Sequence, residues 1–164
     1  MPDSALPTGT VTFLFTDVEG STALWEHHPV AMQAALAHHD SVLRHAIESS
    51  SGHIVKTTGD GVFAVFGAAA DALAACLAIQ RVLQTAEAGA SNPAASEALT
   101  PIALKVRMGL HTGAAEFRDG DYFGPSLSRA ARIMSTAHGE QVLLSAATAE
   151  AVREKLPQGV TLRE

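Results

Sequence analysis

The sequence predicts an α+β fold, and three features of its hydrophobic pattern carry that prediction. In residues 10–17, aromatic and β-branched side chains recur at every second position, which predicts a strand. Residues 30–47 instead carry apolar side chains at helical spacing. Between two short apolar runs stands Asp60-Gly61, a dipeptide that is typical of β-hairpins.

The remaining elements extend this pattern along the chain. The elements after the long helix are expected as strand, strand, helix and strand, at residues 53–57, 62–66, 68–83 and 104–112. The resulting order β-α-β-β-α-β is that of the ferredoxin-like core, an antiparallel sheet with helices on one face. Additional C-terminal strands and helices are expected at residues 114–117, 125–134, 141–144, 146–155 and 160–162.

Length and composition indicate one domain that spans residues 1–164. A chain of 164 residues has the usual size of a single domain. Its 47% hydrophobic and 17% charged residues are typical of a globular protein and exclude intrinsic disorder. Residues 1–8 are expected to be a flexible N-terminus. Residues 85–100, which contain glycine, proline, serine and asparagine, are expected to be a mobile loop.

Charge, hydropathy and cysteine content restrict the partners and the location. The net charge of −6, without a basic run, argues against a nucleic-acid partner or an anionic membrane surface. The longest apolar stretch, residues 61–79, is interrupted by Asp71 and by glycines, so no membrane span is expected. No signal peptide is recognisable, and we expect a cytoplasmic protein. The single cysteine, Cys76, predicts a buried, inert thiol.

Two acidic residues stand out by their positions. Asp17 ends the first strand, and Asp60 occupies the hairpin turn between the second and third strands. These strands can be neighbours in the sheet, which would bring both carboxylates to one edge. Adjacent carboxylates repel each other, and either a shared proton or a divalent cation such as Mg²⁺ relieves that repulsion. Taken separately, each residue also has a structural interpretation, since Asp17 suits a helix cap and Asp60 a tight turn.

The histidines do not predict a metal site. The adjacent pairs at 27–28 and 38–39 point in different directions on a helix, and His45 lies two turns beyond His38. Zinc sites on helices take histidines four residues apart on one face. We therefore expect helix-surface roles for these side chains and a structural role for His111 in its strand.

Three sequence motifs follow one another along the chain. They read Phe-Leu-Phe-Thr-Asp-Val-Glu-Gly-Ser-Thr at 13–22, Ile-Val-Lys-Thr-Thr-Gly-Asp-Gly at 54–61, and Asp-Tyr-Phe-Gly at 121–124 with Ala-Ala-Arg at 130–132. Together they resemble the class III nucleotidyl cyclase catalytic domain, in its bacterial adenylyl cyclase form, from about residue 10 onward. The resemblance implies a ferredoxin-like core with extra elements, and conversion of ATP into 3′,5′-cyclic AMP and pyrophosphate.

The resemblance assigns metal and phosphate chemistry to the first two motifs. Asp17 and Asp60 match the two metal-binding aspartates, and the backbone carbonyl of Val18 adds a ligand. They would hold two divalent cations, Mg²⁺ or Mn²⁺, which activate the ribose 3′-hydroxyl and neutralise the triphosphate. Three residues at a helix start would offer backbone N–H groups to the phosphates, namely Gly20, Ser21 and Thr22.

Base recognition and transition-state stabilisation are implied for the other matching positions. Lys56 and Asp121 match the pair that reads the purine. A lysine donor and a carboxylate acceptor complement N1 and the N6 amino group of adenine, and guanine reverses that pattern. Arg132 matches the arginine that stabilises charge on the transferring phosphate. Ser128 lies one helical turn earlier, where the family usually has an asparagine that orients the ribose.

The resemblance also implies a head-to-tail homodimer with shared sites. In the family, one subunit supplies the metal-binding aspartates, and the other supplies the base-reading and transition-state residues. Two departures favour an alternative, a catalytically weak or inactive cyclase-homology module that binds nucleotide or a protein partner. One is Ser128. The other is the end of the sequence at Glu164, so that the family's C-terminal hairpin with its phosphate-binding lysine is expected to be missing. A metal-dependent phosphohydrolase is a third interpretation.

Overall fold

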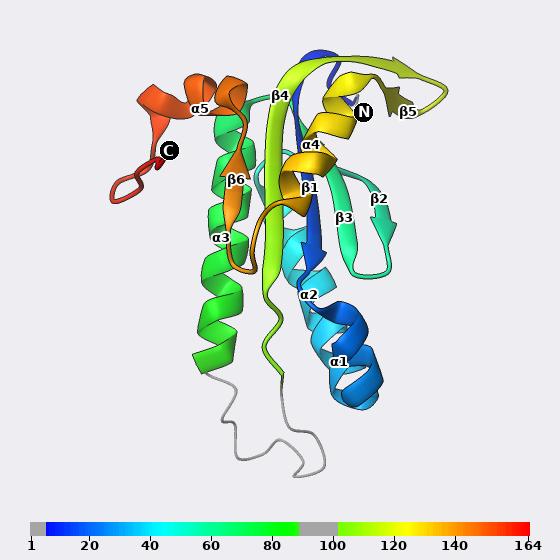
Figure 1. Ribbon diagram of the computed structural model, residues 1–164. Coiled ribbons are helices and arrows are strands. Elements are labelled where there is room, and N and C mark those ends of the chain that lie inside the picture. The colour runs from blue at the N-terminus through cyan, green and yellow to red at the C-terminus, as the bar shows by residue number, and fades with distance from the viewer. Residues whose placement is uncertain (1–5, 89–101) are drawn as a thin grey trace.

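The computed structural model describes residues 6–88 and 102–164. Within them, one sheet has the strand order β2-β3-β1-β4-β5, and β6 pairs in parallel with β4 (Figure 1). The strands are β1 (Gly9–Val18), β2 (His53–Thr58), β3 (Gly61–Phe66), β4 (Val106–Arg118), β5 (Asp121–Phe123) and β6 (Val142–Leu144). The helices are α1 (Ser21–His27), α2 (Pro29–Ser49), α3 (Ala69–Ala88), α4 (Pro125–Ser135), α5 (Ala146–Val152) and the short 3-10 helix η1 (Arg153–Lys155).

The order of the strands confirms the expected fold class. The strands β1 to β4, with α2 and α3 as connecting helices, form the ferredoxin-like βαββαβ core. In this core β1 pairs antiparallel with both β3 and β4, and β2 pairs antiparallel with β3. The C-terminal additions are α4, β6 and α5, and β5 extends the sheet as the return strand of a hairpin with β4.

The helices α2 and α3 pack on one face of the sheet and form the main core with it. The β1 side chains Leu14 and Val18 point to this face and pack in one buried cluster with Leu43 of α2 and Ile79 of α3. Cys76 of α3 lies in the same cluster, as expected, and burial raises the pKa of its thiol. We call this side of the sheet the closed face.

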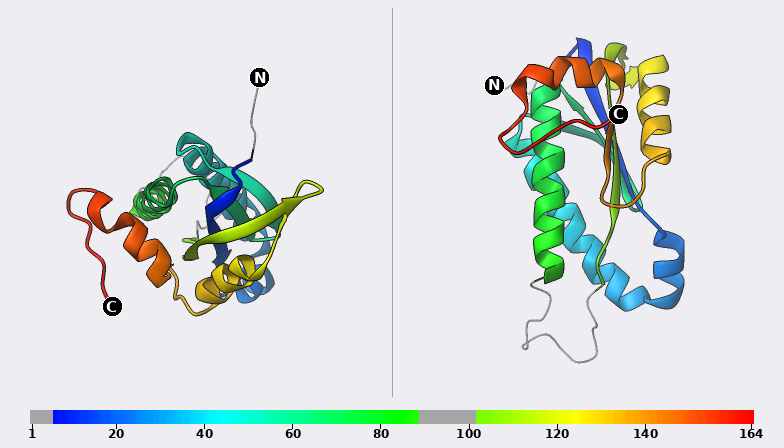
Figure 2. Two further views of the ribbon diagram at one scale, coloured as in Figure 1. Left: turned by 90° about the horizontal axis from the view of Figure 1, so that it is seen from above. Right: turned by 60° about the vertical axis from the view of Figure 1, so that its left-hand side comes forward.

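The opposite side of the sheet is covered by α4, as Figure 2 shows, and we call it the α4 face. Alternation along β1 turns Val11 and Phe13 to this side, where they pack with Phe63, Tyr122 and Ala130. The Phe13 and Tyr122 rings meet edge to face with centroids 5.4 Å apart. The core helices α2 and α3 lie on one face, as expected. Because β1 also carries apolar side chains on its other side, α4 covers them there.

Three expected elements differ from the structure. α3 continues through Ala88, four residues into the segment expected to be a loop, because Gly89 is the first strong helix breaker after residue 83. The rest of that expected loop, 89–100, lies outside the described residues. Residues 160–162 form no strand, and the helix expected over 146–155 ends at Val152 and continues as η1.

The described part of the N-terminal segment contacts the core. Leu6 packs in the cluster on the α4 face, and the Tyr122 hydroxyl donates to the Pro7 carbonyl at 2.6 Å. These contacts hold residues that were expected to be flexible, while residues 1–5 lie outside the described part of the chain. None of the helices that the structure describes combines the length and the apolarity needed to cross a bilayer.

Gly109 of β4 lies directly beneath the end of α4. A Cβ there would come within 2.5 Å of the Met134 backbone nitrogen, so a side chain forces α4 away from the sheet. We expect Gly109→Ala to lower the free energy of unfolding by about 1–3 kcal/mol in urea denaturation. Gly67→Ala is the matched control, because its Cβ would meet only Pro7, at 3.8 Å. Equal stability of the two variants would contradict this packing.

Candidate active site

An ion pair joins the two central strands near the end of β1. Asp17 lies directly opposite Arg107 of β4 in the antiparallel register. The Arg107 guanidinium donates from Nε to Asp17 Oδ1 at 2.6 Å and from Nη2 to Oδ2, which makes a bidentate pair. Its Nη1 donates to the carbonyl of Ser135, at the end of α4, at 3.2 Å. Solvent reaches the pair, since the side chains of Arg107 and Asp17 are 25% and 24% exposed.

Asp60 faces the same strand end from the turn between β2 and β3. Its Oδ2 accepts the backbone N–H of Val18 at 3.0 Å, one residue beyond Asp17. Hydrogen bonding to Asp17 raises the pKa of Arg107 above its usual value, although partial burial opposes the increase. The negative charges of Glu19 and Asp60 raise it further. The two aspartates therefore share one electrostatic environment, and we call Asp17 and Asp60 the acid group.

The acid group fits a hard divalent cation. Mg²⁺ takes oxygen ligands, and one or two carboxylates often hold it together with substrate phosphates. Asp17 and Asp60 supply carboxylates at adjoining strand ends, and the guanidinium on Asp17 shows that this place attracts positive charge. Within the described residues no cluster of three or more metal-ligating side chains occurs. A cation bound here would therefore take further ligands from the substrate or from water.

The turn after β1 leads directly into α1. Gly20 is the N-cap of this helix and has a φ of 69°, a left-handed conformation that favours glycine. No side chain caps the first turn of α1, so its N–H groups are open to an external acceptor. The three residues that were expected to contact phosphates, 20–22, thus lie within a few positions of Asp17.

A second ion pair lies on the α4 face. Lys56 of β2 stands opposite Phe63, which packs on that face, and its Nζ donates to Asp121 Oδ2 of β5 at 2.8 Å. Asp121 Oδ1 accepts the backbone N–H of Tyr122 at 2.8 Å. The hydrogen bond from Lys56, followed by that from Tyr122, lowers the pKa of Asp121 below its usual value. We call Lys56 and Asp121 the base group; it presents a donor beside an ionised acceptor.

The helix α4 presents the remaining expected residues to solvent. It begins with Pro125 at its first position and buries Ala130 against the sheet. Ser128 and Arg132 are both exposed, and the helical repeat places them on the side away from Ala130. Both side chains are therefore accessible to a molecule outside this chain.

The acid group and the base group are built from different contacts within one chain. The acid group is at the end of β1, whereas the base group bridges β2 and β5. No hydrogen bond or ion pair among the described residues connects the two groups. The register places Lys56 across β3 from Phe15, two residues before Asp17, so one ligand would have to span about two strand spacings to contact both groups.

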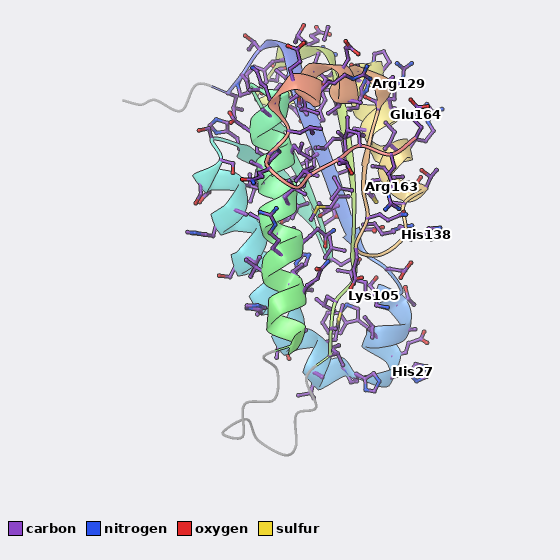
Figure 3. All side chains as sticks on the ribbon, turned by 90° about the vertical axis from the view of Figure 1, so that its left-hand side faces the viewer. His27, Lys105, Arg129, His138, Arg163 and Glu164 are labelled. Atoms are coloured by element: carbon purple, nitrogen blue, oxygen red, sulfur yellow. The ribbon has the colours of Figure 1, made fainter. Side chains whose placement is uncertain are left out.

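Two charged residues near the acid group, Arg107 and Glu19, were not predicted as site residues from the sequence. Arg107 lies inside an apolar strand segment, and its partner becomes evident only when β1 and β4 are aligned in register. Glu19 stands in the first motif; its Oε1 accepts the Gly139 N–H at 3.1 Å, and its own N–H donates to the Lys105 carbonyl at 2.8 Å. These contacts fasten the turn after β1 to Gly139 in the α4–β6 connection and to Lys105 just before β4. Figure 3 shows Lys105 and His138 on the same side of the molecule.

Two buried histidines have structural partners. His111 has its Nδ1 2.8 Å from the Ser145 hydroxyl, and burial, together with the positive charge of Arg129, lowers its pKa. The helix-surface role expected for His39 is wrong, because this residue lies on the same face of α2 as the buried Leu43 and Ile47. Its Nδ1 lies 2.9 Å from the Asp40 carboxylate. Neither belongs to the acid group or the base group.

Known proteins are similar to this chain in sequence and in fold. Residues 4–161 match the family model of the adenylate and guanylate cyclase catalytic domain. A protein of Mycobacterium tuberculosis is 42% identical over 153 residues, which cover 92% of this chain and 48% of that protein. An adenylate cyclase of Lachancea kluyveri is 36% identical over 159 residues, which cover 88% of this chain and 9% of that enzyme. The chain thus spans about half the length of the first relative and less than a tenth of the second.

A solved structure is similar over nearly the whole chain. It is that of an adenylate cyclase from Trypanosoma brucei in its monomeric state, with a TM-score of 0.77 and 28% identity. The similarity covers 95% of this chain and 86% of that one.

We expect an NMR titration to place the pKa of Asp121 below the ordinary 3.8. Lys56→Met should raise it, because that change removes the hydrogen bond that lowers it most. The stabilisation from this ion pair is present at neutral pH and is lost as the pH falls through the lowered pKa. Arg44→Met, which removes an exposed cation of α2, is the control. An equal rise in both variants would contradict a local cause.

Proposed function

Because the chain belongs to the family of adenylate and guanylate cyclase catalytic domains, we propose that it is an adenylyl cyclase that converts ATP into 3′,5′-cyclic AMP and pyrophosphate. In this reaction the ribose 3′-hydroxyl attacks the α-phosphorus, the bond to pyrophosphate breaks, and the hydroxyl loses its proton. The observation that carries the choice of ATP is the hydrogen-bonded pair of Lys56 and Asp121.

Lys56 and Asp121 offer one donor and one acceptor side by side. Adenine needs this arrangement, since its N1 accepts a hydrogen bond and its N6 amino group donates one. Guanine carries a hydrogen on N1 and an acceptor at O6, so both contacts would be mismatched. Each polar group left unpaired costs roughly 1–3 kcal/mol, which favours ATP over GTP.

The triphosphate end is assigned to the acid group. Asp17, Asp60 and the carbonyl of Val18 would hold two divalent cations, Mg²⁺ or Mn²⁺. Such cations, when bound, polarise phosphoryl oxygens and lower the pKa of a coordinated hydroxyl. The open N–H groups at the start of α1, residues 20–22, would contact phosphate oxygens.

The helix α4 contributes the remaining groups. Arg132 carries a permanent positive charge in an exposed position, which suits it to stabilise the negative charge that develops on the transferring phosphate. Ser128, one turn earlier, would orient the ribose through its hydroxyl. It offers one polar atom where an asparagine amide offers two.

A homodimer with shared sites is the arrangement that the family resemblance implies, and the exposed positions of Ser128 and Arg132 on α4 support it. We propose that each site takes Asp17 and Asp60 from one copy. Lys56, Asp121 and Arg132 would come from the other copy. A head-to-tail pair of this kind contains two equivalent sites.

Ser128 favours a second candidate function, a weak or inactive cyclase-homology module that binds nucleotide or a protein partner. The shorter side chain positions the ribose less firmly than an amide does, and positioning contributes strongly to in-line displacement. Calorimetric binding of ATP without formation of cyclic AMP would select this candidate.

The proposed activity is tested by incubating the purified chain with ATP or GTP and Mn²⁺ or Mg²⁺, and separating the products by chromatography. We expect cyclic AMP and pyrophosphate from ATP, with little product from GTP. Asp17→Asn and Asp60→Asn should each lower the rate by about 100-fold or more, because phosphate charge is no longer neutralised. Glu116→Gln, at an exposed position on β4, is the control. Release of inorganic phosphate in place of pyrophosphate would instead indicate a phosphohydrolase.

The shared site is tested by mixing two inactive variants. Asp17→Asn and Arg132→Ala damage opposite halves of a shared site, so a mixed dimer retains one intact site with both residues. We expect activity to return on mixing, up to about a quarter of the wild-type rate if subunits pair at random. Mixing Asp17→Asn with Asp60→Asn is the control, because both variants damage the same half. Absence of recovery in the first mixture would contradict the shared arrangement.

A further inference from the structure

We propose that Arg107 is a positioning residue of the acid group, which occupies Asp17 in the cation-free chain and must leave it when a cation binds. The inference deepens the proposed function and rests on it, since it concerns the same cation site. Its basis is the bidentate contact of Arg107 with Asp17 and the third contact with Ser135.

The geometry makes the guanidinium a competitor of a cation. Both Asp17 carboxylate oxygens accept a hydrogen bond from Arg107, so the side of the carboxylate that faces Arg107 is fully used. A divalent cation on the same oxygens would stand next to a second positive charge, and the two repel each other. Arginine does not lose its proton in this pH range, so deprotonation cannot relieve the repulsion. Arg107 must therefore move away.

The partly exposed position makes this exchange possible. The two side chains are neither buried nor fully solvated, at 25% and 24% exposure. A cation can reach Asp17 from solvent, and the released guanidinium can be hydrated.

The third contact extends the exchange to α4. Arg107 Nη1 donates to the Ser135 carbonyl, and the Ser135 hydroxyl donates to the Arg132 carbonyl at 2.7 Å. Arg107 thus ties the acid group to the last turn of the helix that carries Arg132. When Arg107 leaves Asp17, this tie is released, and the last turn of α4 loses one of its contacts with β4.

Titration calorimetry with Mn²⁺ alone, without nucleotide, tests the exchange. We expect Arg107→Gln to bind Mn²⁺ about tenfold more tightly than the wild-type chain, because the competing charge is gone. Lys105→Gln is the matched control. It removes a positive charge two residues earlier in the sequence, beside the α4–β6 connection (Figure 3), and should change the affinity less than about threefold. Arg107→Lys keeps the positive charge but cannot make the bidentate contact. Its Mn²⁺ affinity should lie between those of the wild-type chain and Arg107→Gln.

Hydrogen–deuterium exchange adds a readout for α4. In the wild-type chain, Mn²⁺ should increase exchange in the last turn of α4, whereas in Arg107→Gln this exchange should already be increased without Mn²⁺. Such a gain in affinity together with a loosened helix end is not expected if Arg107 only supports the fold.

Three outcomes would overturn the inference. One is an Mn²⁺ affinity of Arg107→Gln that equals or falls below that of the wild-type chain. Another is an equal gain in Lys105→Gln, which would indicate general electrostatics. The third is the absence of Mn²⁺ binding in every variant, which would overturn the proposed cation site as well. The first two outcomes leave the proposed function standing and reject only the role of Arg107.

Discussion

The pairing of β1 with both β3 and β4 is the constraint on which the rest of the structure depends. Thr16 lies opposite Val62 on one side and Met108 on the other, so the next residue, Asp17, meets the β2–β3 turn and Arg107 together. A slip of one residue would turn Asp17 toward the closed face and bury its charge among apolar side chains. The side chains of β1 oppose that slip, because Leu14 and Val18 pack on the closed face and Val11 and Phe13 pack on the α4 face.

With this register, the two faces of the sheet differ in composition and in role. The closed face is filled by side chains of α2 and α3 and serves stability. The α4 face is apolar only in its middle, around Phe13 and Tyr122, and its margins carry the acid group and the base group. Charged residues can stay on such a margin because solvent still reaches them, whereas full burial would carry a large desolvation cost.

Opposite charges within the chain satisfy both groups in the absence of a ligand. Asp17 is neutralised by Arg107, and Asp121 by Lys56. Both pairs are open to solvent, so a ligand can compete for either partner. The proposed chemistry requires such exchange at one end of the site and added contacts with a base at the other.

The sequence by itself determined the elements and the local positions of the acids. Alternation over 10–17, the helical period over 30–47 and the hairpin at Asp60 act over a few residues, so they can be recognised without a structure. Only the tertiary structure decided that Arg107 pairs with Asp17, 90 residues away, and that Lys56 pairs with Asp121, 65 residues away. Such contacts depend on the register of the whole sheet and on the path of α4 across it, and no local propensity encodes either.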